Sequence, residues 1–204
     1  MKIRLNIVSD YVCPFCYVGQ DVVNKLKENY DVEVDWSPFY LRPDTPPEGT
    51  KLPPDAQKHM QGRSDWFFSR AKAAGMTMVF PDFLPNTRLA HEATEFAREK
   101  GRLEEFHSRV FRLYYAEGRD ISSWEVLREA ATDAGLDGDE MQNAVESGKY
   151  RDLVAGKIAE AQELGIEGVP TYILNDRYAI VGAQPYELFE QAVKKLEDEE
   201  PQQE

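Results

Sequence analysis

The residues Cys13-Pro14-Phe15-Cys16 hold the only two cysteines of the 204-residue chain, at the junction of an apolar segment and a helical one. Their spacing is typical of a dithiol redox motif, because it brings two sulfur atoms within bonding range on one helical turn. A structural zinc site needs more ligands than this pair supplies. A structural disulfide here would close a very short loop and constrain little of the unfolded chain. The sequence therefore predicts redox chemistry at this pair.

The residues around Cys13 predict that it stands at the start of a helix. An apolar run from Ile3 to Val8 predicts a strand, and Pro14 suits the first helical position because its missing N–H is not needed there. Free backbone N–H groups and the positive end of the helix dipole stabilise a thiolate at that place. We therefore expect Cys13 to be the exposed thiol of lowered pKa that attacks a disulfide. Cys16 is expected to be more buried and to resolve the mixed disulfide.

The charge balance excludes some classes of partner. The chain has 24 Lys and Arg against 37 Asp and Glu, a net charge of −13. Such a surface repels nucleic acid and anionic membranes, so neither is an expected partner. No apolar run reaches the roughly 18 residues of a membrane span, and charges interrupt the first residues, so neither a span nor a signal peptide is predicted. We expect a cytoplasmic protein, where a lone cysteine pair stays reduced unless it turns over.

Strand and helix patterns divide the chain into four expected parts. Residues 1–42 read as strand, helix and parallel strand, the first part of an α/β domain. Residues 43–149 open with five prolines between Pro43 and Pro54 and then read as helices without a convincing strand, so they predict a helical insertion. Residues 150–197 return to the α/β domain with a helix, a hairpin that turns at Asn175 and Asp176, and a last helix. Residues 198–204 predict an acidic disordered tail.

Capping residues and polar side chains mark the expected helices of the insertion. Helix starts are predicted at four residues: Ser64, Asn86, Ser122 and Asp137. Residues 76–85 are expected to form an ordered loop. One polar helical stripe is expected to be solvated, with exposure to a substrate groove as the alternative; it comprises Thr87, His91, Thr94 and Arg98. The three histidines share no metal-ligand spacing, so no metal site is predicted.

The order of elements and motifs resembles the thioredoxin superfamily, and the large insertion resembles its DsbA-like branch. The motifs are the Cys-x-x-Cys helix and the later Val169-Pro170-Thr171. Further pieces are similar to the FrnE-like cytoplasmic group, which is related to kappa-class glutathione transferases and 2-hydroxychromene-2-carboxylate isomerases; they are Ser9-Asp10, Asn86-Thr87, Ala90-His91 and Gly182-Ala183-Gln184. The resemblance covers nearly the whole chain. It implies an α/β, thioredoxin-like fold with a large all-helical insertion.

The resemblance also implies the substrate-binding residues. It implies a cis peptide bond between Val169 and Pro170, packed beside Cys13. A proline there supplies no N–H and binds no metal, while the backbone of Val169 can pair with an extended substrate. The expected substrate-binding residues are Pro14, Phe15, Val169, Pro170 and Thr171. Asp10 is a candidate proton relay to the dithiol, and a plain turn residue after a strand is the simpler interpretation.

The leading functional hypothesis is a thiol–disulfide oxidoreductase that forms a mixed disulfide on Cys13 with a protein or small-molecule substrate. It needs no bound cofactor beyond its redox-active disulfide, and glutathione is a candidate co-substrate. Pro14 and Phe15 donate no hydrogen bond or charge to a thiolate, so we expect a potential more reducing than that of DsbA.

Two other classes remain open. One is a glutathione-dependent transferase or isomerase of the kappa type. A resemblance to that class would imply a serine-containing motif at the position of Cys13 and an acidic residue with an arginine at Gln184-Pro185. This chain departs from the kappa-type pattern at both positions. The other is a chaperone-like module that binds in a groove without turnover, which full function of a Cys13→Ser variant would indicate. The sequence predicts neither the substrate nor the oligomeric state.

Overall fold

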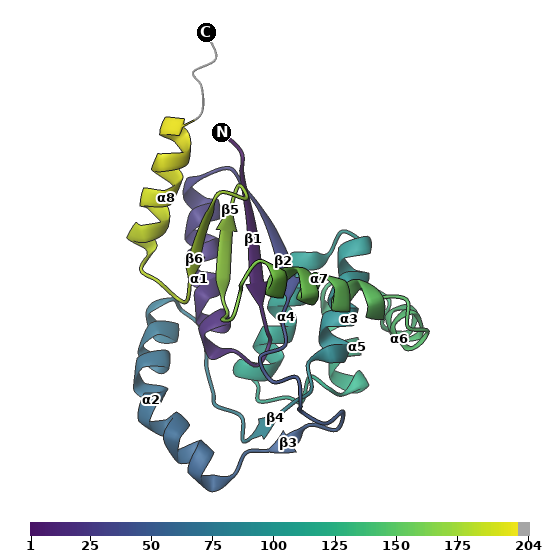
Figure 1. Cartoon of the computed structure of the whole chain (residues 1–204). Helices are drawn as coiled ribbons and strands as arrows, with labels where there is room; N and C mark the ends of the chain where they lie inside the picture. Colours follow the sequence, from purple (N-terminus) through teal and green to yellow (C-terminus); the bar gives the residue numbers. More distant parts are fainter. Residues whose placement is uncertain (200–204) are drawn as a thin grey trace.

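The computed structural model describes residues 1–199, apart from the side chains of residues 56–64. A four-stranded sheet has the order β2-β1-β5-β6, with helices on both of its faces and further helices beside it (Figure 1). Its strands are β1 (Ile3–Ser9), β2 (Val32–Pro38), β5 (Thr171–Leu174) and β6 (Tyr178–Val181). β1 and β2 are parallel, as predicted, and β5 runs antiparallel to both β1 and β6. This is the thioredoxin-like arrangement that the sequence predicts.

The predicted hairpin between β5 and β6 is confirmed. Three residues separate the paired ends Leu174 and Tyr178. The two central residues of the turn have left-handed backbones, with φ of 48° at Asn175 and 57° at Asp176, as a type I′ turn requires. The turn is also tied to β1, because the side-chain oxygen of Asn175 accepts a hydrogen bond from the backbone N–H of Arg4 at 2.7 Å. The hairpin is thereby held in register with the strand that leads to the dithiol.

Helices cover the two faces of the sheet unequally. α1 (Pro14–Asn29) and α8 (Tyr186–Glu199) pack on one face, in a core that includes Leu5, Val23 and Phe189. α7 (Arg151–Glu163) packs on the other face, where Ala161 meets Val8 and Phe39. That face therefore has its apolar cover at the end of β1 that precedes the Cys-x-x-Cys segment (Figure 1).

The inserted helices form a second core. They are α2 (Pro54–Ala73), α3 (Arg88–Glu99), α4 (Leu103–Tyr115), α5 (Trp124–Asp133) and α6 (Gly138–Glu146). The dithiol segment belongs to this core and not to that of the sheet, since Cys13, Cys16 and Tyr17 pack with Phe111 and Ala93. The site thus lies where the two cores meet.

Several predicted boundaries in the insertion are wrong. α2 begins at Pro54, so Ser64 lies inside it; Pro54 is suited to the first turn because its N–H has no helical partner there. The structure also has two short antiparallel strands where the sequence predicted none, β3 (Thr50–Lys51) and β4 (Phe83–Leu84). Each of these strands has two residues, and their partners lie more than thirty positions apart in the sequence, so no local pattern predicts them.

The capping predictions have mixed outcomes. The side chain of Asp137 accepts hydrogen bonds from two N–H groups of α6, as predicted, and that of Asn86 accepts one from the N–H of Arg88 at 3.0 Å. Ser122 caps nothing and donates its hydroxyl to Asp120 at 2.6 Å. α8 ends at Glu199, beyond the predicted boundary at 197, and the rest of the predicted tail, residues 200–204, lies outside the described residues. In the part of the chain that the structure describes, no helix is both long and apolar enough to cross a membrane.

Candidate dithiol site

Cys13 lies at the predicted place, immediately before the first residue of α1. Its backbone is extended, with φ of −91° and ψ of 112°, and Pro14 occupies the start of the helix. Both thiols are free. The pKa of Cys13 is lowered, first by a hydrogen bond from the Cys16 side chain and then by the backbone N–H groups of Cys16 and Phe15. Burial and the negative charge of Asp10 act in the opposite direction.

The second thiol has the opposite character. Burial raises the pKa of Cys16 well above its ordinary value, and the neighbouring Cys13 raises it further. The Ser9 side chain and the backbone N–H of Asp10 lower that pKa in part. The two thiols therefore differ in the order that the sequence predicts, with Cys13 the more easily ionised.

The expected exposure of Cys13 is wrong, because the residue is only 2% exposed. The loop before β5 lies against its sulfur, and the thiol donates a hydrogen bond to the carbonyl oxygen of Val169 at 3.4 Å. The peptide bond between Val169 and Pro170 is cis, as the resemblance implies. Pro170 is in turn held by the N–H of Gly182, which donates to its carbonyl oxygen at 2.7 Å.

Aromatic side chains surround the site on the α2 side. The ring of Phe15 is 37% exposed and lies 4.8 Å from that of Phe67 and 5.6 Å from that of Trp66. Trp66 is 47% exposed, whereas Phe67 is buried. The surface beside the dithiol is therefore apolar and partly open.

The other expected substrate-binding residues differ in exposure. Pro14 and Val169 are half-buried, and Pro170 is buried. Thr171 is buried too, and its hydroxyl donates to the carbonyl oxygen of Gly168 at 2.7 Å. Its side chain holds the loop together and does not line the surface, contrary to the expectation that it rims the groove.

A glycine allows α1 to lie close to β5 beneath the site. A Cβ atom at Gly19 would lie 2.2 Å from the hydroxyl oxygen of Tyr172. Tyr172 is 1% exposed, and its ring packs edge-on against that of Phe189 at 4.9 Å. The same Cβ would lie 3.8 Å from Pro170, so this contact places the helix of the dithiol against the loop that covers it.

A buried acid–histidine pair adjoins the dithiol segment, since the backbone carbonyl oxygen of Asp10 accepts the N–H of Cys13 at 3.0 Å. The carboxylate of Asp10 accepts the N–H of Leu41 at 2.7 Å through one oxygen. Its other oxygen lies 3.2 Å from the Nε2 atom of His91, which the inserted helix α3 supplies. Asp10 is 1% exposed and His91 is 5% exposed. Asp10 is therefore more than the plain turn residue of the simpler interpretation.

The expected solvated stripe on α3 is wrong for most of its members. Thr87, His91 and Thr94 are buried, and Thr94 pairs with the hydroxyl of Tyr11 at 2.5 Å. Sequence reasoning did not place His91 in the site, because only its position in a weak motif marked it and its partner stands 81 residues away.

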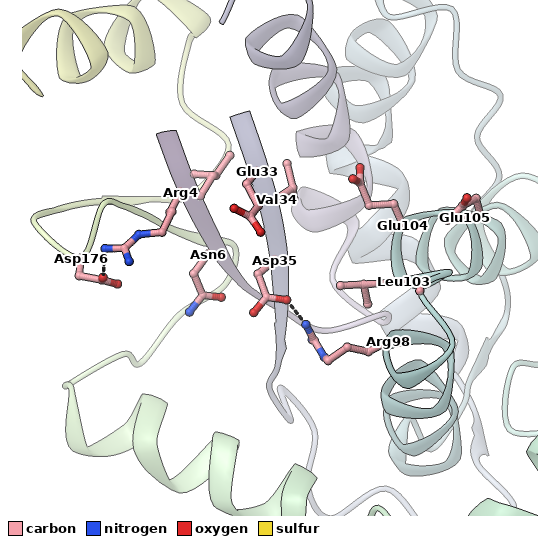
Figure 2. Close-up of a pocket in the computed structure, with 12 residues that line it drawn as sticks. Arg4, Asn6, Glu33, Val34, Asp35, Arg98, Leu103, Glu104, Glu105 and Asp176 are labelled. Carbon is pink, nitrogen blue, oxygen red and sulfur yellow. Dashed lines mark hydrogen bonds and ion pairs between the residues drawn. The ribbon is translucent and has the colours of Figure 1, made fainter. Parts of the chain in front are cut away.

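Other parts of the described structure offer no comparable chemistry. Among the side chains of residues 1–55 and 65–199, no three of His, Cys, Asp or Glu form a group that could bind a metal ion. Figure 2 shows a hollow of about 880 Å³ on the sheet, away from the dithiol. Its arginines are already paired, Arg98 with Asp35 and Arg4 with Asp176. The dithiol therefore remains the candidate site.

Known proteins resemble the chain over nearly its whole length. The model of the DSBA-like thioredoxin domain matches residues 4–194. The uncharacterized protein YwbO of Bacillus subtilis (strain 168) is 34% identical over 196 residues, which cover 95% of this chain and 96% of that protein. The crystal structure of the probable DsbA oxidoreductase SCO1869 from Streptomyces coelicolor is 30% identical with a TM-score of 0.90, over 99% of this chain and 93% of that one. The cytosolic disulfide reductase DsbM from Pseudomonas aeruginosa, with GSH, is 18% identical and shares the fold with a TM-score of 0.70, over 94% and 99% of the two chains.

Proposed function

The chain belongs to the DsbA-like thioredoxin-domain family, and from that premise we propose that it is a thiol–disulfide oxidoreductase working through Cys13 and Cys16. The observation that carries the proposal is the asymmetry of the two thiols. Cys13 has a lowered pKa at the start of α1, and Cys16 has a raised pKa one turn further on. In a pair of this kind the more easily ionised thiol attacks the substrate, and the other thiol resolves the mixed disulfide.

The reaction proceeds in two exchanges. The Cys13 thiolate attacks a substrate disulfide, forms a mixed disulfide and releases the first substrate thiolate. Cys16 then loses its proton and attacks the Cys13 sulfur, which releases the second substrate thiolate and leaves a Cys13–Cys16 disulfide. The substrate gains two electrons and the dithiol loses two. The reverse sequence oxidises a substrate dithiol.

Substrate binding is proposed for the residues that border Cys13. Phe15 and the half-buried Pro14 supply apolar contact, and the backbone of Val169, beside the buried Pro170, can pair with an extended chain. Thr171 contributes by holding this loop, through its bond to Gly168. The Asp10 carboxylate is the proposed proton relay. The support is that Asp10 is close to Cys16, since the backbone N–H of the same residue acts on the Cys16 thiol.

We further propose that the protein works in the cytoplasm with glutathione as a co-substrate. The support is that DsbM, a cytosolic disulfide reductase of the same fold, has a structure with GSH. The kappa-type alternative has less support here, because the Gln184 side chain donates to the carbonyl oxygen of Val181 at 2.9 Å and no acidic residue stands beside it in the sequence.

Trapping tests the proposed chemistry. In a Cys16→Ala variant no thiol remains to resolve the mixed disulfide, so substrates should stay bound to Cys13 and be released by dithiothreitol. The matched control is the Cys13→Ala, Cys16→Ala double variant, which should trap nothing. Equal recovery from both variants, or none from Cys16→Ala, would show that Cys13 does not exchange with disulfides. Full cellular function of Cys13→Ser would favour the binding module.

A further inference from the structure

The buried pair of Asp10 and His91 joins the inserted helices to the chemistry of the dithiol. Asp10 comes from the turn between β1 and α1, and His91 comes from the first turns of α3. The N–H of Asp10 acts on the sulfur of Cys16, and its carboxylate acts electrostatically on Cys13. Asp10 is also bonded to the dithiol segment directly, because its backbone carbonyl oxygen accepts the N–H of Cys13 at 3.0 Å.

The hydrogen bonding of the pair fixes where one proton resides. An ionised carboxylate only accepts hydrogen bonds, so His91 carries a proton on Nε2 when Asp10 is ionised. The other Asp10 oxygen is occupied by the N–H of Leu41, which holds the carboxylate in place. Carboxylate oxygens have more than one acceptor site each, so Asp10 can accept a further proton.

The groups that face His91 are otherwise unsuited to exchange protons near neutral pH. Two phenols lie against its ring, the buried Tyr11 at 5.0 Å and the half-buried Tyr40 at 5.7 Å. Desolvation raises the pKa of both, that of Tyr40 to about 12. His107 of α4 lies in the same small cavity, and burial lowers its pKa well below the ordinary range, so it stays neutral.

The acidic neighbour on the same helix is also committed to partners. Glu95 lines the cavity with His91, and both of its carboxylate oxygens lie 2.8 Å from the Lys157 ammonium. It also accepts a hydrogen bond from Arg98 at 2.9 Å. Among the groups that face His91, Asp10 is therefore its proton partner.

We propose that His91 is a positioning residue that acts through Asp10, so that the pair takes up the proton that Cys16 loses when it resolves the mixed disulfide. The inference rests on the proposed function and adds a role for the inserted helix α3 within it. The Cys16 S–H bond breaks, the proton passes to the Asp10–His91 pair, and the thiolate forms the Cys13–Cys16 bond. The substrate sulfur leaves with the electron pair of the broken mixed disulfide.

A two-phase reaction with the aromatic disulfide dithiobis(nitrobenzoate) tests this role. In the reduced protein, attack by Cys13 releases one coloured thiolate and resolution by Cys16 releases the second, so stopped-flow absorbance separates the two steps. We compare wild type, His91→Gln and His107→Gln between about pH 5 and pH 9. Glutamine keeps a hydrogen-bond donor for Asp10 but does not titrate. His107 is equally buried in the same cavity and makes no hydrogen bond to Asp10, so it is the matched control.

The inference predicts a selective effect on the second phase. His91→Gln should slow that phase by roughly tenfold near neutral pH, less than the 10²–10⁴ lost with a direct acid–base group, because Asp10 remains. Its rate should then rise steeply with pH, because the raised pKa of Cys16 now limits it. The first phase, and both phases of His107→Gln, should follow the wild type.

The other outcomes of the experiment distinguish failure of this inference from failure of the proposed function. A second phase of wild-type rate and pH profile in folded His91→Gln overturns the inference and leaves the proposed function intact. A wild-type protein without a second phase contradicts the proposed function itself. Should His91→Gln fail to fold by circular dichroism, Asp10→Asn makes the same comparison, because it keeps His91 and removes the acceptor. A wild-type second phase in Asp10→Asn would equally overturn the role of the pair.

Discussion

At the scale of single residues, the reactivity of the dithiol is decided by a few groups around one sulfur. Hydrogen bonds at the start of α1 stabilise the Cys13 thiolate, while burial and the charge of Asp10 oppose it. The helix start was predictable from Pro14 and the apolar run before it. The opposing charge was not, because Asp10 is brought to the dithiol by the turn and fixed there by Leu41 and His91.

We therefore predict a reduction potential clearly below that of DsbA, which lies near −120 mV. The charge of Asp10 offsets part of the stabilisation of the Cys13 thiolate and so disfavours the reduced form. One unit of thiol pKa corresponds to about 1.4 kcal/mol, or roughly 30 mV for this couple. Asp10→Asn should shift the potential toward more oxidising values by up to about 30 mV, because its charge is the smaller of the two effects that oppose the thiolate. Asp21→Asn, which removes an acid on α1 paired with Lys25, is the control and should not shift it.

Equilibration in glutathione buffers, with the Cys13–Cys16 disulfide quantified by mass, measures the potential. A wild-type value as oxidising as that of DsbA would contradict the prediction and would make an oxidase the better interpretation of the protein.

At the scale of elements, the close approach of α1 and β5 holds the dithiol against the loop that covers it. The sequence predicted the helix and the strand, since each follows from a local apolar period. It did not show why position 19 is glycine, because the reason is a hydroxyl group more than 150 residues away in the chain.

Gly19→Ala should destabilise the protein by about 1–3 kcal/mol, because the buried ring of Tyr172 has no room to move and overpacking outweighs the gain in helix propensity. In a Tyr172→Phe background the same change should cost much less, since the clashing oxygen is gone. Gly156→Ala is the control: it is an exposed helical glycine with open space at its Cβ, and its substitution should stabilise by up to about 1 kcal/mol. Urea midpoints of the wild type, Gly19→Ala, Tyr172→Phe, the double variant and Gly156→Ala measure these effects. Equal costs of Gly19→Ala in the two backgrounds would show that the hydroxyl is not the obstacle.

At the scale of the whole molecule, a charged network ties the inserted helices to the sheet. Glu95 of α3 is 2% exposed and binds Lys157 of α7. Arg98 binds Glu95, the side chain of Asp35 and the carbonyl oxygen of Trp36 on β2. Three elements from the two cores thus share one network.

Lys157→Met should destabilise the protein by about 2 kcal/mol, since it leaves the buried Glu95 with Arg98 as its remaining counter-charge. The control is Lys149→Met, which breaks an ion pair with Glu99 whose two side chains are half-exposed and should cost at most about 1 kcal/mol. Urea unfolding compares the two. Equal losses of stability in the two variants would mean that the Glu95–Lys157 contact contributes no more to stability than a surface ion pair does.

The sequence predicts features that depend on local interactions, and it misses those that depend on contacts between distant segments. The sheet order, the Asn175-Asp176 turn and the cis bond before Pro170 follow from local patterns or from the family resemblance, and the structure has all three. The burial of Cys13 and the pair of Asp10 with His91 depend on packing between distant segments. The pairing of β3 with β4 was not predicted for the same reason.

The membership of the dithiol segment in the core of the inserted helices limits how this protein can be simplified. Cys13, Cys16 and Tyr17 pack among side chains of α3 and α4, and α3 also supplies the histidine that pairs with Asp10. Splicing the two halves of the sheet together with a short linker would keep every strand and both cysteines, yet it would strip the reactive turn of its packing and of its acid's partner. In this chain the helical segment is part of the smallest unit that can be transplanted with the active site, and grafting the four-residue motif alone would not carry it.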